Sequence, residues 1–414
     1  NGSLIIKDST GNSSNGGSIS QAIVNISGNK FTNTGSITAS QEFTNSAANL
    51  ENNNTITSNG SFTNTGNITG QGSISANQGG TNTGSMTQNE VTTGGTFNNG
   101  DGTTAGTITT DKLTNNGTFT NNGSIIASTI TNQTGKEFIN NSGKEITAES
   151  FINQGSVTNN GTINAESLTN TSSITGNTGS LIISNGGTNS GTISQNIVSI
   201  TGGTLTNNNS ITANEFNNSA TISGSGSLTV TTGNNSGNIT QDNVTINGDY
   251  TNTGTITSNN NFTNSGDISG DGGKLIVNNG SNSGSISQDT LETSGTFENT
   301  GSIIADITNG GTFTNNGTVG TNQNKAEITN NGTFTNNNSV IASAITNNEN
   351  KTFTNAGTVV TDKITNNGTL NGNGSITIGG GENSTTGDIS QNNITINGNF
   401  ANNGDMTANN SFSN

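Results

Sequence analysis

The sequence predicts an all-β fold, an elongated parallel β-helix with about 20 residues per coil and asparagine ladders at its corners. Three observations predict it. The 414 residues include 60 Gly but no Pro, apolar residues return six positions apart, and whole blocks recur. The stretch LTNNGTFTNNGSIIAS at 113–128 returns almost unchanged as ITNNGTFTNNNSVIAS at 328–343.

The short repeat has the form apolar-x-Asn-x-Gly-x-apolar. A helix is excluded, because each interior Gly costs about 1 kcal/mol and Asn and Thr compete with the helical backbone for hydrogen bonds. Copies begin at Phe31, Phe62, Phe151, Tyr250 and Phe353.

Between the Asn-x-Gly steps, apolar and small polar residues alternate, as in SLTV at 227–230. This alternation is typical of short strands. Asn and Gly accept left-handed backbone angles, so we expect corners with such angles at the NNG and NTG triplets. A hairpin meander is the alternative, but it would leave free strand edges.

A longer period favours the solenoid over the meander. Six stretches end in Gln, at positions 21, 88, 195, 241, 288 and 391. The spacing from Phe119 to Phe138 equals that from Phe334 to Phe353, and it is close to one coil of a parallel β-helix. We therefore predict one continuous repeat domain over 1–414, with sub-blocks at roughly 1–72, 73–179, 180–226, 227–273, 274–374 and 375–414.

Stacked coils lie about 4.8 Å apart, which buries apolar side chains in a column and lets equivalent corner amides bond to one another. The predicted core residues are Phe31, Phe62, Phe119, Phe138, Phe334 and Phe353. The predicted ladder residues are Asn33, Asn64, Asn115, Asn121, Asn330 and Asn336.

The stretches FTNTGSITA at 31–39 and FTNNNSVIA at 334–342 resemble the L-x-N-x-G-x-I-x-A unit of filamentous-haemagglutinin-type adhesins. These are two-partner-secreted and autotransporter-like β-helical proteins of bacterial surfaces. The resemblance covers nearly the whole chain, and Phe often replaces the Leu of the unit. It implies a right-handed β-helical shaft that is secreted to a Gram-negative cell surface.

Composition excludes several other classes of protein. The net charge is -16 and the nine basic residues are all Lys, so nucleic acid is not an expected partner. No run of about 18 apolar residues predicts a membrane span. Hydrophobic residues make up only 24%, which raises the hypothesis of disorder, but the charged fraction is only 8% and the apolar residues are regularly placed.

Carboxylates are the remaining candidates for chemistry. Glu137, Glu145 and Glu149 cluster in one stretch, and Asp267 and Asp271 in another. Paired carboxylates can act as acid and base, and Asp-Gly segments can bind calcium. Lys residues stand beside both clusters and the regular calcium-binding nonapeptide is absent, so solvated ion pairs explain them better. We expect no enzyme activity, no cofactor and no metal.

The sequence therefore predicts a structural shaft, extracellular on a bacterial cell surface, that serves adhesion or biofilm. Its partners are expected to be further coils of its own kind and a host-cell or matrix receptor bound through other regions. The alternative is a filament subunit that stacks through uncapped coils, since both ends of the sequence continue the repeat. Ice binding is a minor alternative, because Thr-rich solenoids can present flat arrays of hydroxyl groups and TIT triplets occur at 107–109 and 255–257. These Thr-x-Thr units do not recur at one constant position per coil, as a flat array would require.

Overall fold

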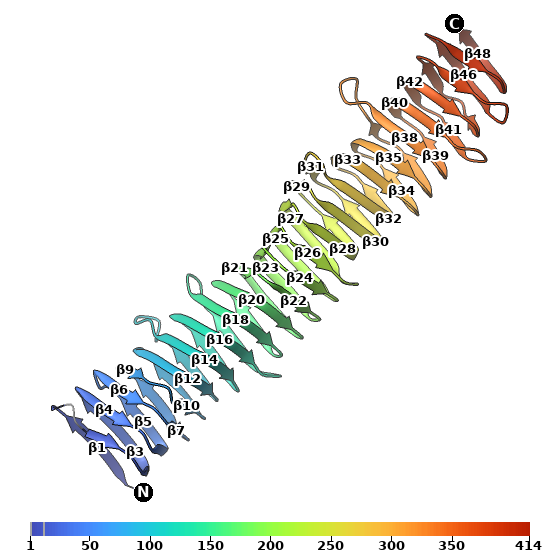
Figure 1. Cartoon of the computed structure of the whole chain (residues 1–414). Coiled ribbons are helices and arrows are strands. Elements are labelled where there is room, and N and C mark those ends of the chain that lie inside the picture. Colours follow the sequence, from blue (N-terminus) through green and yellow to red (C-terminus); the bar gives the residue numbers. More distant parts are fainter. Residues whose placement is uncertain (1, 11–12) are drawn as a thin grey trace. The chain divides into compact units, whose positions relative to one another are not determined.

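The computed structural model of the protein describes residues 2–10 and 13–414. Its fold is a right-handed parallel β-solenoid, as predicted. The chain forms two compact units, Asn1–Ala213 and Asn214–Asn414, in which successive coils lie side by side (Figure 1). Asn1, Gly11 and Asn12 belong to the predicted repeat domain but lie outside the described residues.

The first unit contains strands β1 to β24. Their bounds are β1 (Ser3–Asp8), β2 (Ser13–Asn15), β3 (Ser18–Gly28), β4 (Lys30–Asn33), β5 (Ser36–Asn45), β6 (Asn49–Asn52), β7 (Thr55–Ser58), β8 (Ser61–Asn64), β9 (Asn67–Thr69), β10 (Ser73–Ala76), β11 (Gly79–Asn82), β12 (Ser85–Thr93), β13 (Thr96–Asn99), β14 (Thr107–Asn115), β15 (Thr118–Asn121), β16 (Ser124–Asn132), β17 (Glu137–Asn140), β18 (Glu145–Asn153), β19 (Ser156–Asn159), β20 (Thr162–Asn170), β21 (Ser173–Ile183), β22 (Gly186–Asn189), β23 (Thr192–Ile200) and β24 (Thr204–Asn207).

Strand β25 (Ser210–Asn218) contains the boundary residues, and the second unit continues to β48. The bounds of its strands are β26 (Thr221–Ser223), β27 (Ser227–Asn235), β28 (Asn238–Ile246), β29 (Tyr250–Asn252), β30 (Thr255–Asn264), β31 (Asp267–Ser269), β32 (Lys274–Asn282), β33 (Ser285–Thr293), β34 (Thr296–Asn299), β35 (Ser302–Asn309), β36 (Thr312–Asn315), β37 (Thr318–Val319), β38 (Ala326–Asn330), β39 (Thr333–Asn336), β40 (Ser339–Asn347), β41 (Thr352–Asn355), β42 (Thr358–Asn366), β43 (Thr369–Asn371), β44 (Ser375–Ile378), β45 (Gly381–Asn383), β46 (Asp388–Ile396), β47 (Phe400–Asn402) and β48 (Asp405–Ser413).

Each coil is built from three short segments. In β14 the inward alternation stops at the exposed residues Asp111 and Lys112, so this one strand supplies two segments, and β15 supplies the third. Strands pair with their equivalents in the neighbouring coils, so that Phe119 lies opposite Phe138 and Phe334 opposite Phe353. The observed coil, about 18 residues, is slightly shorter than the predicted one.

Longer coils contain loops at a corner, and the ladder of strands continues past them. The loop at 100–106 separates β13 from β14, and it lies between the register partners Asn99 and Asn121. The loop at 320–325 separates β37 from β38, and it lies between the partners Val319 and Val340. An insertion is thus absorbed outside the core, where it breaks no strand pairing.

The reason for Gly in the short repeat differs from the predicted one. Gly35, Gly66, Gly155, Gly254 and Gly357 do not adopt left-handed angles. A Cβ atom at each would instead lie 1.9 to 2.2 Å from a carbonyl oxygen of the preceding coil. The prediction of left-handed corners is therefore wrong at these positions, where Gly is needed because the backbones of stacked coils approach too closely for a side chain.

The asparagine ladders as the candidate functional site

Buried asparagines form ladders along the corners, as the sequence predicts. Asn121 is fully buried, and its Nδ2 donates to Oδ1 of Asn140 in the next coil at 2.9 Å. The same Nδ2 donates to the carbonyl oxygen of Gly123 at 3.3 Å, and the Gly123 amide donates back to Oδ1 of Asn121. The amide is therefore satisfied both within its own corner and between coils, as a buried polar group requires.

Three ladders run through the described part of the first unit. Consecutive members are joined by Nδ2 to Oδ1 bonds of 2.7 to 2.9 Å, always from the earlier to the later coil. The first ladder is Asn15, Asn33 and Asn52; the second is Asn45, Asn64, Asn82, Asn99, Asn121, Asn140 and Asn159; the third is Asn115, Asn132, Asn153, Asn170, Asn189 and Asn207.

The second unit has three ladders with the same direction and bond lengths. They are Asn218, Asn235 and Asn252; Asn264, Asn282, Asn299, Asn315, Asn336 and Asn355; and Asn309, Asn330, Asn347, Asn366, Asn383 and Asn402. The predicted ladder residues Asn33, Asn64, Asn115, Asn121, Asn330 and Asn336 all lie in these six ladders.

A ladder ends at a glutamine that reaches across one coil. Nδ2 of Asn52 donates to Oε1 of Gln88 at 2.5 Å, although the two residues are 36 positions, or two coils, apart. Gln88 Nε2 in turn donates to the carbonyl oxygens of Asn52 and Gly70. The same two-coil bond joins Asn159 to Gln195, Asn252 to Gln288 and Asn355 to Gln391. Gln is one methylene longer than Asn, and its amide fills the gap that the coil between leaves open.

Glycine occupies the skipped coil. Gly70 has φ of 108°, and a Cβ atom there would lie 2.3 Å from the carbonyl oxygen of Asn52. Backbone of this kind favours Gly, and the absent side chain leaves the space that Gln88 enters. The same arrangement recurs one coil before the Gln of four later recurring stretches, in the pairs Gly176 and Gln195, Gly224 and Gln241, Gly270 and Gln288, and Gly372 and Gln391.

These glutamines and glycines are the structural residues that sequence reasoning missed. The recurrence of Gln was visible as a long period, but it assigned no role to the Gln side chain itself. The missing signal was the Gly that precedes each of these five Gln residues by one coil, which marks the point where a column of amides stops.

The predicted core residues are buried in both units. The exposed fraction of Phe31 is 3%, and Phe62, Phe119, Phe138, Phe334 and Phe353 have none. Four of them are stacked in pairs: the ring centroids of Phe119 and Phe138 are 4.7 Å apart, and those of Phe334 and Phe353 are 4.6 Å apart. Ring stacking along the axis therefore accompanies the amide ladders.

The carboxylates considered for chemistry lie on the surface. Glu145 accepts a bond from Asn164 at 2.8 Å, while Glu137, Glu149, Asp267 and Asp271 are exposed. Within 2–10 and 13–414, no three His, Cys, Asp or Glu side chains are grouped so that they could hold a metal ion. The same residues include no helix long and apolar enough to cross a membrane.

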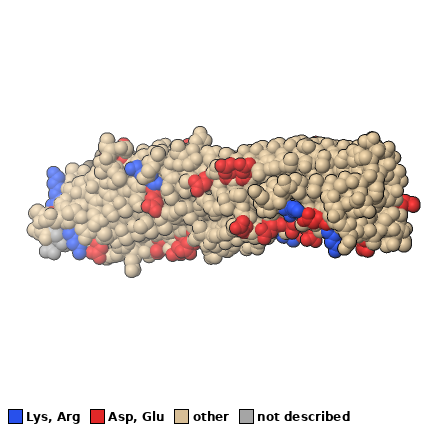
Figure 2. Space-filling view, turned by 90° about the horizontal axis from the view of Figure 1, so that it is seen from above, with Lys and Arg blue, Asp and Glu red and all other residues tan. Residues whose placement is uncertain are grey.

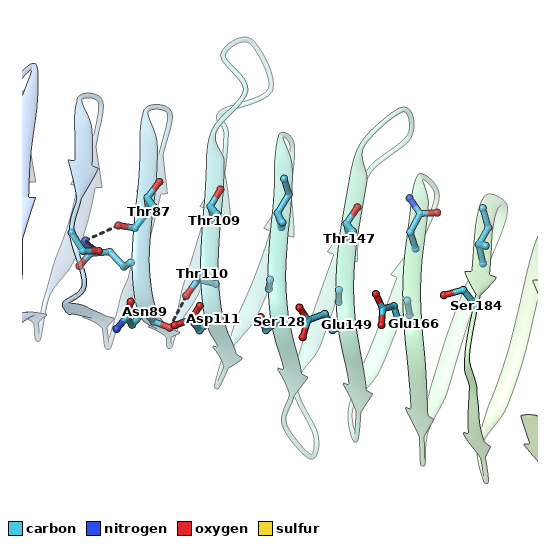
Figure 3. Close-up of a pocket in the computed structure, with 18 residues that line it drawn as sticks. Thr87, Asn89, Thr109, Thr110, Asp111, Ser128, Thr147, Glu149, Glu166 and Ser184 are labelled. Atoms are coloured by element: carbon cyan, nitrogen blue, oxygen red, sulfur yellow. Dashed lines mark hydrogen bonds between the residues drawn. The ribbon is translucent and has the colours of Figure 1, made fainter. Parts of the chain in front are cut away.

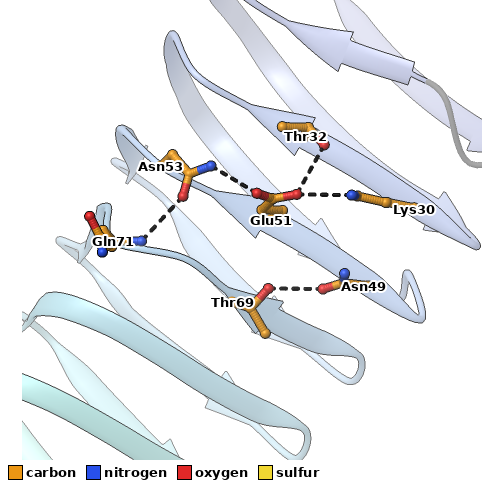
Figure 4. A network of polar contacts seen from close by, with 7 residues as sticks. All are labelled: Lys30, Thr32, Asn49, Glu51, Asn53, Thr69 and Gln71. Atoms are coloured by element: carbon orange, nitrogen blue, oxygen red, sulfur yellow. Dashed lines mark hydrogen bonds and ion pairs between the residues drawn. The ribbon is translucent and has the colours of Figure 1, made fainter.

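One surface network does shift a pKa. Lys30 Nζ lies 3.0 Å from Glu51 Oε2, and Asn53 and Thr32 donate to the same carboxylate (Figure 4). The hydrogen bond from Lys30 is the largest cause, and Asn53 adds to it, so the pKa of Glu51 is lowered. Elsewhere, acidic groups are scattered over the face seen in Figure 2, with few basic groups beside them.

Comparison with known proteins finds no matching family model, no similar curated protein and no similar solved structure. The class of protein therefore follows from the fold and the ladders of this chain. It is a repetitive β-solenoid scaffold whose buried side chains stack from coil to coil.

Proposed function

We propose that the chain is the shaft of a secreted bacterial surface adhesin or extracellular fibre, which supplies length and stability for adhesion or biofilm. The observation that carries this proposal is the repetitive composition of the core. In both units the buried residues are stacked rings, aliphatic side chains and Asn ladders that repeat from coil to coil. Such a core resists local unfolding, because each coil is paired with the coils on both sides.

The location and the shaft role have separate tests. Antibodies against the chain should label intact cells of the source organism as strongly as permeabilised cells; labelling only after permeabilisation would contradict an extracellular role. Removal of 116–132, the 17 residues from one ladder position to the next, deletes one whole coil. It should leave the protein folded and shorten the reach by about 4.8 Å, and deletion of several coils should reduce adhesion of cells that display it.

The second candidate is a filament subunit that stacks end to end. The observation that favours it is the coil-to-coil pairing itself: within each unit a coil is bound through parallel strands and ladder bonds to a coil of the same kind, so a like coil is the partner that such a surface fits. Electron microscopy of the purified chain at concentrations a hundredfold apart separates the two proposals. Particles of constant length support the shaft, whereas fibres that lengthen with concentration support the filament.

A further inference from the structure

A groove lies on the first unit where the first ladder has ended. Beyond Gln88, the same register position carries Thr110, Ala127, Ala148 and Ala165 in successive coils. These small side chains leave a groove of about 570 Å³ along the corner (Figure 3). The end of a ladder thus changes the outer surface as well as the interior.

The rim of this groove is acidic. Asp111, Ser128, Glu149 and Glu166 follow one another on successive coils and line one side (Figure 3). The three carboxylates, Asp111, Glu149 and Glu166, are exposed. None of them forms an ion pair or a hydrogen bond with another of the described residues, 2–10 and 13–414. No Lys is among the described residues that line the groove. Glu149 and Glu166 stand one coil apart, about 4.8 Å, so their like charges repel and a cation between them would be stabilised.

The corresponding corner of the second unit contains a cation from the chain itself. Beyond Gln288 the corner carries Ala305, Ala326 and Ala342, and the loop at 320–325 lies over it. Lys325 Nζ lies 2.6 Å from Oδ1 and 2.7 Å from Oδ2 of Asp362, two coils further along. A lysine side chain therefore extends along this kind of corner and bonds to a carboxylate on its rim.

We propose that the groove of the first unit binds an extended, lysine-bearing peptide segment of a positively charged protein partner. The Lys ammonium groups would bond to Glu149 and Glu166 as Lys325 does to Asp362. The charge of the chain, -16, argues for a cationic partner and against a second copy. The groove crosses the coils from β12 to β21, about 24 Å at about 4.8 Å per coil, which matches about seven extended residues.

Fluorescence anisotropy with a labelled seven-residue peptide of alternating Lys and Ala tests the proposal, with a Glu and Ala peptide as the negative probe. At low salt the Lys peptide should bind with one site per chain. The double variant Glu149→Gln, Glu166→Gln should bind at least tenfold more weakly. Glu349→Gln removes an exposed charge outside the groove and should bind as the parent does. Equal binding by the groove variant and the parent would overturn the proposal.

The two units offer an exchange test. Ser128→Lys places an ammonium on the rim between Asp111 and Glu149, where it can pair with the groove carboxylates as Lys325 pairs with Asp362. It should abolish binding while the thermal unfolding midpoint stays unchanged. Lys325→Ala should open the second corner and raise the stoichiometry from one peptide to two. Retained binding by a folded Ser128→Lys chain overturns the proposal, as does binding of spermine or Ca²⁺ without binding of the peptide.

Discussion

The two units carry the same series of three glutamines but different numbers of coils between them. The series is Gln21, Gln88 and Gln195 in the first unit and Gln241, Gln288 and Gln391 in the second. The interval from the first Gln to the second is longer in the first unit by about one coil, whereas the intervals from the second Gln to the third are nearly equal.

The ladders show where the additional coil went. The second ladder of the first unit contains seven asparagines, from Asn45 to Asn159, and its counterpart contains six, from Asn264 to Asn355. A coil can therefore be gained or lost without disturbing a ladder, because each member needs only a like amide in the next coil. Length varies in whole coils, and smaller insertions become corner loops.

The largest expected effect is the loss of a stacked ring, and it should be equal in the two units. Phe119→Ala and Phe334→Ala each remove a fully buried ring from a matched stack. Each should cost about 3 to 5 kcal/mol of unfolding free energy in its own unit. Urea unfolding followed by hydrogen exchange in each unit measures this. Thr120→Ala, on the outward side of β15, is the control, and an unchanged Phe119→Ala variant would show that the stack does not stabilise the unit.

Loss of a ladder amide should come next. Asn121→Ala and Asn336→Ala each remove a buried donor and acceptor, and they take the ladder donor away from Oδ1 of the following Asn, Asn140 or Asn355. We expect about 1 to 3 kcal/mol for each. Asn337→Ala removes an exposed Asn in the same stretch and should change stability little. If the buried and exposed variants unfold at the same urea concentration, the ladder hydrogen bonds stabilise the folded chain no more than hydrogen bonds to water stabilise the unfolded chain.

Substitutions at the glutamines that end the ladders test whether the length of the Gln side chain matters, in addition to its burial. Gln88→Asn and Gln288→Asn keep the amide but shorten the side chain, so neither can cross the skipped coil to Asn52 or Asn252. Both should lose as much stability as the matching Ala variants, about 1 to 2 kcal/mol. Chemical unfolding of the four variants measures this, and an Asn variant as stable as the parent would contradict the need for a two-coil reach.

A smaller difference between the units concerns Tyr250, which stands where the first unit has Phe31 in the matched FTN and YTN triplets. The Tyr250 hydroxyl is buried without a partner among the described residues, and burial raises its pKa. Tyr250→Phe should therefore be neutral or stabilising by up to about 1 kcal/mol at pH 7.

The raised pKa also predicts a pH dependence for Tyr250. The folded chain keeps the phenol protonated, so this contribution to stability is complete below the unfolded pKa of about 10 and is lost as the pH rises above it. Urea unfolding at pH 7 and pH 11 should show a larger alkaline loss for the parent than for Tyr250→Phe. Equal losses of stability in the two chains would mean that the Tyr250 phenol ionises as readily in the folded chain as in the unfolded chain.

The smallest expected effect is at Glu51, whose ion pair with Lys30 is partly exposed. Its lowered pKa means that the stabilisation is present above the ordinary pKa of Glu, about 4.3, and is lost as the pH falls through the folded value. An NMR titration should show the pKa of Glu51 returning toward the ordinary value in about 0.5 M salt, because exposed pairs are screened. Lys30→Ala should have the same effect at low salt.

The sequence was informative about the repeated parts and less so about the interruptions. The six-residue spacing of apolar residues predicts the strands. The identical short repeats predict buried Asn columns, because each repeat places its Asn at the same position and stacking brings these positions together. The role of Gln88 depends on Gly70 one coil earlier, a relation between residues that only the register brings together. The groove depends in turn on which corner lacks a ladder, and no local stretch of sequence contains that information.

The common direction of the ladder bonds makes each ladder a polar object with two unlike ends. At the start of one ladder, Oδ1 of Asn115 accepts from the Gly117 amide and the Thr93 hydroxyl. At the far end of another, Nδ2 of Asn52 donates onward, and the Oε1 atom of Gln88 is the acceptor. Blocks of this solenoid are therefore cassettes that can be joined only head to tail, since a reversed joint would set donors against donors. In engineered solenoids, a Gly and Gln pair one coil apart would serve as a stop signal for one corner while the others continue.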